Sequence, residues 1–372
     1  MGSNSLVIAQ SRFSFQTVAA NSLPLHTAHL NFFYTFSITK EIEMNTDQYY
    51  QYSNKTLFAI KSDAERYAWA GYYLFVIISS LVGDTTILIA SLKYGAIKLH
   101  RVIVVIIQHI ALCDLLVTLS VVPTFVSIIS DEWVLGNFLR YMTTYTRNFS
   151  YQASLFLICN MTTSKLLLLK YPFRFRTVSV KTANMICGAV WMAALILPFT
   201  FLLIDNDDIY FSYIIYGCEH SPTSNMWDWL EPLLTVVLMF IPNCLVVATT
   251  VYLLIIAKQV ARRGRKSLKW QGIMTTVLSA TVYCISVLPY FVTGFGKYVV
   301  TVDDTSSSSF NTSLDRIAYS FIYLNTISNF YIYSLSVQSF RHFIFSRIQL
   351  ILNQTLTRIG SAARHGKGVA LK

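Results

Sequence analysis

The sequence has few charged residues, and its acidic residues are absent from four whole segments. Asp, Glu, Lys and Arg make up 13% of the 372 residues, against about 25% in a soluble domain. None of the 18 Asp and Glu residues lies in residues 93–101, 165–181, 258–269 or 338–372, which hold 3, 5, 6 and 6 of the 29 Lys and Arg residues. The low charge excludes an ordinary soluble domain. The net charge of +11 therefore reports membrane topology and does not predict a nucleic-acid partner.

Other absences narrow the classes of function. The sequence has no metal-ligand cluster, phosphate-binding loop or nucleophile motif, so we predict neither an enzyme nor a bound cofactor. It has no internal repeat, which disfavours a transporter built from duplicated halves. Asp84 and Asp114 could suggest an intramembrane aspartyl protease, but the Tyr-Asp and Gly-x-Gly-Asp contexts of that family are absent.

The chain instead contains long apolar stretches between its basic segments. About 20 apolar residues in a helix cross the roughly 30 Å of a bilayer interior. Basic loops are retained in the cytoplasm, and an odd number of spans then places the N-terminus outside and the C-terminus inside. We predict an all-α membrane protein with seven transmembrane helices near residues 68–92, 102–130, 138–164, 184–204, 229–257, 272–296 and 317–337.

The segments on either side of this bundle have different characters. Residues 1–67 are polar, contain no apolar core of a cleavable signal and are predicted to be an extracellular tail. Asn54 and Asn311 begin glycosylation sequons on the predicted outer face. Residues 68–337 form the predicted bundle, and residues 338–372 an amphipathic eighth helix and a cytoplasmic tail that contact membrane lipids.

Short motifs occur in a fixed order along these predicted helices. They are Gly83-Asp84, the run from Ile110 to Val117 around Asp114, Trp133 to Gly136, Trp191, Pro242, Pro289-Tyr290, and Leu324 to Tyr333 followed by Phe340-Arg341. Together they resemble the rhodopsin-like (class A) family of G-protein-coupled receptors over about residues 66–350. The Asn-Phe-x-Ile-Tyr form of the seventh helix is similar to invertebrate peptide and orphan receptors.

This resemblance implies a plasma-membrane receptor that transmits the binding of an extracellular ligand to a heterotrimeric G protein. Thr355, Thr357 and Ser361 offer sparse phosphorylation sites for regulation by arrestin. An alternative is a divergent seven-helix receptor that does not signal conventionally, as a scavenger or a dimer partner. Three departures from the family pattern, described below, keep that alternative open.

The family's sodium pocket is matched by Asp114, Ser154, Asn325 and Asn329. The resemblance thus implies a Na⁺ ion at Asp114, where a carboxylate and neutral oxygens suit a hard cation. Asp84 replaces the usual Asn of the first helix and places a second carboxylate in this region. Two neighbouring carboxylates do not both ionise at low cost, so we hypothesise a switch coupled to a proton or to sodium.

The residues implied in G-protein coupling begin with Lys165. The usual Asp-Arg-Tyr is replaced by Ser164-Lys165-Leu166, and Lys lacks the planar guanidinium that makes bidentate contacts. Raised basal activity and weak coupling are both expected consequences of this change.

The sixth and seventh helices carry the other activation residues. Tyr283 stands where the family usually has Phe, Pro289 permits a bend, and Val287 replaces a Trp. The proline after Asn329 is replaced by Phe330, so we expect a straighter seventh helix and a smaller inward swing of Tyr333.

The ligand class is predicted mainly from Arg147. The resemblance places it where amine receptors carry Asp, so it should repel amines and attract carboxylate, phosphate or sulfate. Alternatively, it pairs with Glu231 or Asp228 across the bundle. An aromatic cup is expected at the pocket-lining positions Tyr151, Tyr290, Phe291, Tyr319 and Tyr323. Glu231, near the outer end of the fifth helix, is also expected among the ligand-binding residues. We predict a peptide or a small acidic molecule as the ligand.

The cysteines do not provide the usual outer disulfide. Cys218 is the only cysteine in a predicted outer loop, and the position that would hold its partner at the top of the third helix is Arg140. We expect no bridge within the chain, with pairing between molecules as the alternative.

Overall fold

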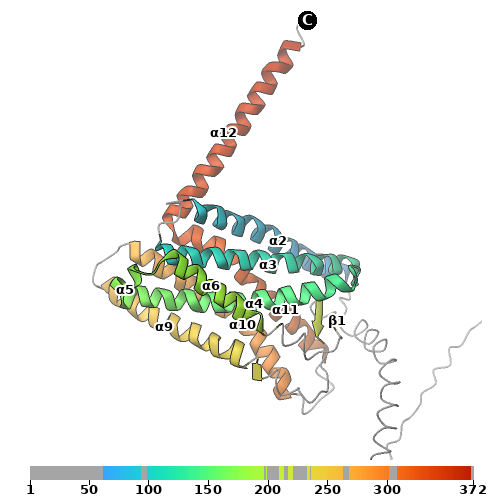
Figure 1. Ribbon diagram of the computed structural model, residues 1–372. Coiled ribbons are helices and arrows are strands. Elements are labelled where there is room, and N and C mark those ends of the chain that lie inside the picture. Colours follow the sequence, from blue (N-terminus) through green and yellow to red (C-terminus); the bar gives the residue numbers. More distant parts are fainter. Residues whose placement is uncertain are drawn as a thin grey trace, which may run out of the picture. The chain divides into compact units, whose positions relative to one another are not determined.

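The computed structural model describes residues 62–93, 99–196, 198, 209–212, 217–220, 233–234, 236–262, 268–300 and 308–369 (Figure 1). The expectations for the tail, Asn54, Asp228 and Glu231 lie outside these residues, as do the side chains of Cys218 and Asn311. Helices account for most of the described chain. They are α2 (Asp63–Leu92), α3 (Arg101–Ser130), α4 (Gly136–Lys170), α5 (Pro172–Arg176), α6 (Val180–Ala194), α9 (Ile241–Arg262), α10 (Leu268–Val300), α11 (Ser308–Ser336) and α12 (Gln338–Val369).

Five of these helices contain a stretch long and apolar enough to cross a membrane. They are α2, α3, α4, residues Val237–Ile256 of the fifth predicted span, and Gly272–Thr293 in α10. Each coincides with one of the seven stretches predicted from the sequence. The fourth and seventh predicted spans overlap α6 and α11. The fifth span opens with one π-helical turn, η1 (Val236–Phe240), which leads directly into α9.

Local sequence accounts for several helix starts. Asp63 and Glu65 lie in the first turn of α2, where negative charge complements the helix dipole. Pro172 occupies the first turn of α5, where a missing N–H costs nothing. Ser179 caps α6, since its Oγ accepts a hydrogen bond of 3.1 Å from the Thr182 N–H.

A short hairpin adds to the helical architecture. Strands β1 (Ile209–Ser212) and β2 (Gly217–His220) are antiparallel, with Ile209 opposite His220 and Ser212 opposite Gly217. The hairpin lies in the predicted second outer loop. This hairpin was not predicted from the sequence, because four-residue strands carry too little periodic pattern.

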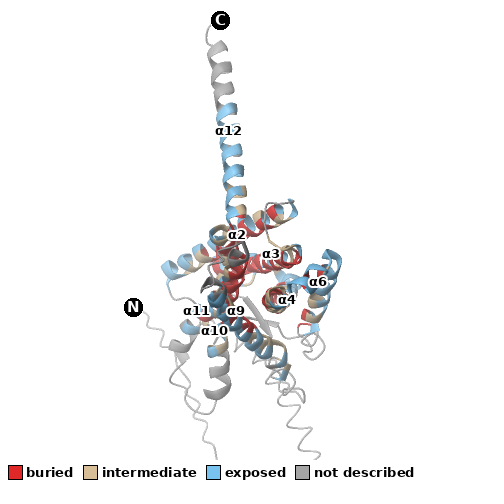
Figure 2. Ribbon diagram, turned by 90° about the vertical axis from the view of Figure 1, so that its left-hand side faces the viewer, coloured by how far each residue is buried: buried red, intermediate tan, exposed pale blue. Residues whose placement is uncertain are grey.

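The buried residues face the interior of the bundle, while most apolar side chains on its outer surface are exposed, as expected for contact with lipid (Figure 2). Two polar contacts between described residues of α2 and α11 lie near one end of these helices. The Tyr72 hydroxyl donates to the Ser320 carbonyl at 2.6 Å, and Arg316 Nη1 lies 3.1 Å from Glu65 Oε1. The first and seventh spans are therefore fastened together near one end.

Further along the same seam, Gly83 lets these two helices approach closely. A Cβ atom built on Gly83 would lie 2.7 Å from Phe330 Cβ and 3.1 Å from its Cγ. Real Cβ atoms essentially never show such short contacts, and the obstructing atoms lie at the base of the Phe330 side chain. Phe330, which replaces the family's proline, thus packs into a notch in α2.

A single residue, Val337, separates α11 from α12, and aromatic contacts hold the start of α12. Phe340 is fully buried, and its ring centroid lies 6.4 Å from that of Tyr333 and 6.2 Å from that of Phe330. The described side chains from Phe345 to Thr357 are exposed. The predicted eighth helix is present, and its placement along the membrane stays a prediction.

Replacing Gly83 by Ala should lower the free energy of unfolding by about 1–3 kcal/mol, the usual cost of overpacking. Gly71 lies on the same helix with no atom within 4 Å of a built Cβ, so Gly71→Ala is the matched control. Its melting temperature should equal or exceed that of the wild type, because Ala favours helix over Gly. The measurement is thermal unfolding in detergent, and equal melting temperatures for both variants would contradict the notch.

Candidate functional site

The predicted ligand residues of α4 and α11 come together around Arg147. Its side chain is buried, and the guanidinium carbon lies 5.5 Å from the centroid of the Tyr319 ring. Tyr323 lies one turn further along α11, with ring centroids 6.1 Å from Tyr319 and 6.3 Å from Tyr151. A cation over the face of an aromatic ring is attracted by the ring's negative π face, as Arg147 is placed over Tyr319. The acids proposed as alternative partners of Arg147 lie outside the described residues.

The aromatic group extends to α10 and α2. Tyr290 lies 6.1 Å from Tyr319, and Phe291 lies 6.2 Å from Tyr290. Tyr73 of α2 stacks edge-on against Tyr323 at 5.5 Å and is 2% exposed. Sequence reasoning missed Tyr73. The cluster of aromatic residues at positions 69, 72 and 73 was the available signal.

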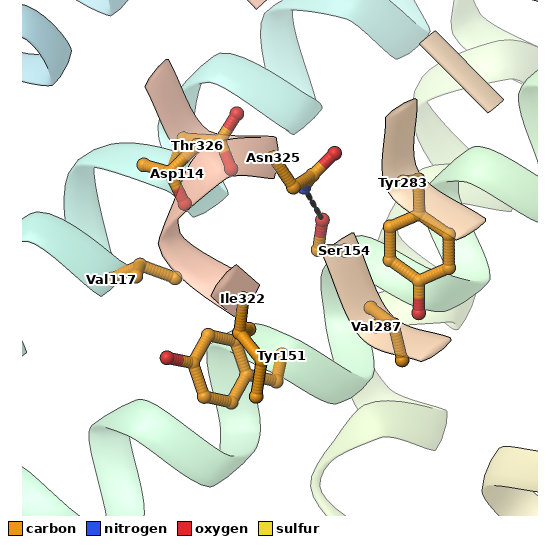
Figure 3. Close-up of a pocket in the computed structure, with 9 residues that line it drawn as sticks. All are labelled: Asp114, Val117, Tyr151, Ser154, Tyr283, Val287, Ile322, Asn325 and Thr326. Carbon is orange, nitrogen blue, oxygen red and sulfur yellow. Dashed lines mark hydrogen bonds between the residues drawn. The ribbon is translucent and has the colours of Figure 1, made fainter. Parts of the chain in front are cut away.

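A cavity of about 20 Å³ lies next to Tyr151 of this aromatic group. Figure 3 shows the side chains around it, which are Asp114, Val117, Tyr151, Ser154, Tyr283, Val287, Ile322, Asn325 and Thr326. Tyr151 belongs to the aromatic group and Asp114 to the predicted ion pocket, so one cavity borders both predicted sites. Its volume suffices for one water-sized species.

The predicted ion-pocket residues also lie together. Asn329 Nδ2 donates to Asp114 Oδ2 at 2.7 Å, and Asn325 Nδ2 donates to Ser154 Oγ at 3.4 Å. The Ser80 hydroxyl donates to Asp84 Oδ2 at 2.6 Å. Both carboxylates are buried, and the second oxygen of each, Oδ1, has no hydrogen-bond partner among the described residues. Ser80 was not predicted.

Lys165 is 4% exposed and packs against α10. A Cβ atom built on Gly272 would lie 2.8 Å from Lys165 Nζ and 3.2 Å from Leu99 Cδ2. Among the described residues, no acidic side chain forms an ion pair with Lys165. The next residue after Leu99 is His100, whose ring packs against Phe175 with a centroid distance of 5.1 Å.

The remaining predicted activation residues lie between α4, α10 and α11. Tyr283 is buried and lines the cavity, Pro289 lies inside α10, and Tyr333 is 1% exposed. Hydroxyl contacts cross the same region. Thr249 donates to Thr162 at 3.0 Å between α9 and α4, and Thr275 donates to Ser336 at 2.9 Å between α10 and α11.

Comparison with known proteins decides the family. The family described as 7 transmembrane receptor (rhodopsin family) matches residues 83–333, which is more than half of the chain. The chain belongs to this family. Membership confirms the predicted seven-helix membrane fold, and it confirms that the chain is a receptor and not an enzyme.

Human chemokine XC receptor 1 is a relative of this receptor. The two are 27% identical over 150 residues, which is 40% of this chain and 42% of that receptor. The match spans less than half of the relative's length, so its own ligand and partners do not transfer directly.

The receptor should lose stability on acidification through His100. Burial, followed by the charges of Lys165 and Arg176, lowers the pKa of His100 from its usual 6.5. The unfolded chain therefore binds a proton more readily than the folded one, and stability falls as the pH drops below about 6.5. The melting temperature of the wild type should fall more steeply between pH 7 and 5 than that of His100→Gln, which cannot titrate. Parallel pH profiles for the two proteins would contradict this.

Proposed function

We propose that this receptor binds a peptide or a small molecule that carries an acidic group, and that it transmits this binding to a heterotrimeric G protein. The observation that carries the proposal is the buried Arg147 with its guanidinium over Tyr319. A buried guanidinium favours planar anions that accept two hydrogen bonds. The surrounding tyrosines provide aromatic surface for the remainder of the ligand.

The similarity to a chemokine receptor supports a peptide as the ligand. The name of that relative states that it recognises a chemokine, and the rhodopsin-family match includes Arg147, Tyr151, Tyr290, Tyr319 and Tyr323. A protein or peptide carries carboxylate groups that could reach Arg147. A peptide ligand is consistent with the acidic ligand predicted from Arg147 on α4.

Replacing Arg147 by Ala should reduce the potency of acidic ligands by about tenfold or more. A hydrogen bond to a charged group contributes about 1.5–3 kcal/mol, and 1.4 kcal/mol corresponds to tenfold in affinity. The measurement is a panel of amidated peptides, peptides with free carboxylates and small carboxylic acids, read by a second-messenger assay on wild type and variant. Arg66→Ala is the control, because Arg66 pairs with Asp63 at 2.7 Å on α2. Equal responses of wild type and Arg147→Ala would remove the anion site.

The alternative is a receptor that does not signal conventionally. Measuring G-protein activation in cells, first without ligand and then with it, distinguishes the two functions. A wild-type receptor that reaches the cell surface and binds a ligand from the panel, yet activates no G protein, would support a scavenger or dimer partner. Surface expression is quantified in the same cells, so that poor delivery is not mistaken for absent coupling.

We further propose that Asp84 and Asp114 form a switch that responds to sodium or to protons. The unpartnered Oδ1 atoms of both carboxylates, the Ser154 hydroxyl and the adjacent cavity fit a hard cation. Such a cation would supply positive charge that compensates the carboxylates. The chain's own contribution is to hold Asp114 by Asn329 and Asp84 by Ser80, so that the free oxygens keep their positions.

Sodium should raise the melting temperature of the purified receptor relative to N-methylglucamine at equal ionic strength. A ligand at a hundredfold excess over its Kd stabilises by about 2.7 kcal/mol. Asp114→Asn should abolish the shift, and Asp84→Asn should change both the sodium response and its dependence on pH. If Asp84→Asn kept the sodium and pH responses of the wild type, in unfolding and in ligand-free signalling, the two-carboxylate switch would be wrong.

A further inference from the structure

Among the described residues, the glycines inside helices fall into two groups. They are Gly71, Gly83, Gly188 and Gly272. Gly71 and Gly188 have no heavy atom within 4 Å of a built Cβ, whereas Gly83 and Gly272 face side chains from other elements. Gly83 faces Phe330, and Gly272 faces Lys165. Each of these two glycines thus contacts a residue that departs from the family pattern, Phe330 or Lys165, at a position implied in activation.

The two contacts differ in what a methyl group would displace. At Gly83 the nearest obstructing atom is Phe330 Cβ, at 2.7 Å, whose position is fixed by the backbone of α11. At Gly272 the nearest atom is the terminal Nζ of Lys165, at 2.8 Å, and the next is Leu99 Cδ2, at 3.2 Å. The end of a lysine side chain moves easily, so an added methyl group would displace the ammonium at little cost in packing.

Lys165 is buried among described residues that do not neutralise its charge, so displacing its ammonium group should affect the receptor. The side chain is 4% exposed and has no acidic partner among the described residues. His100 lies near Lys165, and the other charge that acts on His100, that of Arg176 on α5, is also positive. A buried ammonium without a counter-ion is disfavoured relative to one in water or next to an acid. The absence of a side chain at Gly272 leaves room for the ammonium at its present position.

We propose that Gly272 is a positioning residue that seats the Lys165 ammonium against α10 in the resting receptor. This seat replaces the ion pair that an arginine and an adjacent acid would provide, because Ser164 supplies no acid here. Separation of α10 from α4 would empty the seat and present the ammonium to an acidic group of a partner. The effect on coupling rests on the proposed G-protein function, whereas the seat itself does not.

The seat is tested first without any G protein. The full-length receptor in detergent is treated with a water-soluble succinimidyl ester, and the acylation rate of each lysine is measured by peptide mass spectrometry. Lys258, exposed on α9, serves as the internal reference. Gly272→Ala should raise the rate of Lys165 relative to Lys258 severalfold, with little change in melting temperature.

Gly188→Ala is the matched control, since it adds the same methyl group to a helix where nothing lies within 4 Å. It should leave the Lys165 rate at the wild-type value. An unchanged Lys165 rate in Gly272→Ala, or an equal increase in Gly188→Ala, would overturn the seat. A melting temperature that falls sharply in Gly272→Ala would also overturn it, because the contact would then be ordinary packing.

Coupling is tested second, in a double-mutant cycle with Lys165→Met. Gly272→Ala should change ligand-free second-messenger signalling when Lys165 is present and should have no effect in the Lys165→Met background. An equal effect in both backgrounds would overturn the role of Lys165. Faster acylation without signalling from any variant, wild type included, would support the seat and contradict the proposed coupling.

Discussion

The interior of a membrane offers no hydrogen-bond partners, so each polar group in a spanning helix must find its partner within the protein. Helices satisfy the backbone, and the few buried side-chain charges then determine where the helices meet. Asp114 meets Asn329 between α3 and α11, whereas Arg316 pairs with the partly exposed Glu65 just outside the predicted first and seventh spans. Polar contacts therefore also join the helices, and among the described residues α11 makes them with α2, α3, α4 and α10.

Space for side chains between neighbouring helices is the second requirement, and a glycine provides it at two places. The seam between α2 and α11 closes at Gly83, and that between α4 and α10 closes at Gly272. These contacts hold side chains that the family pattern does not predict, Phe330 and Lys165. The loss of a proline and an arginine is thus accompanied by specific packing, which argues against the view that these positions have simply lost their roles.

Helical spacing explains which parts of the site could be predicted. Arg147 and Tyr151 are four residues apart, as are Tyr319 and Tyr323, so each pair lies on one face of its helix. Family motifs then indicated that the two faces meet, and the structure agrees. Tyr73 and Ser80 were missed because their roles depend on how α2 rotates against its neighbours. The contacts of Gly83 and Gly272 were missed because a glycine carries no pattern of its own.

The cavity connects the aromatic group with the ion-pocket residues, since it borders residues of both. Val287 is smaller than the tryptophan of the family pattern, and the space beside it is bordered by Tyr151 on one side and Asp114 on the other. The cavity therefore borders the aromatic group around Arg147 through Tyr151 and the ion-pocket residues through Asp114. A ligand that moves Tyr151 would change the space next to Asp114. Because free energies of binding are coupled reciprocally, a cation or proton at the carboxylates would in turn alter ligand affinity through the same few residues.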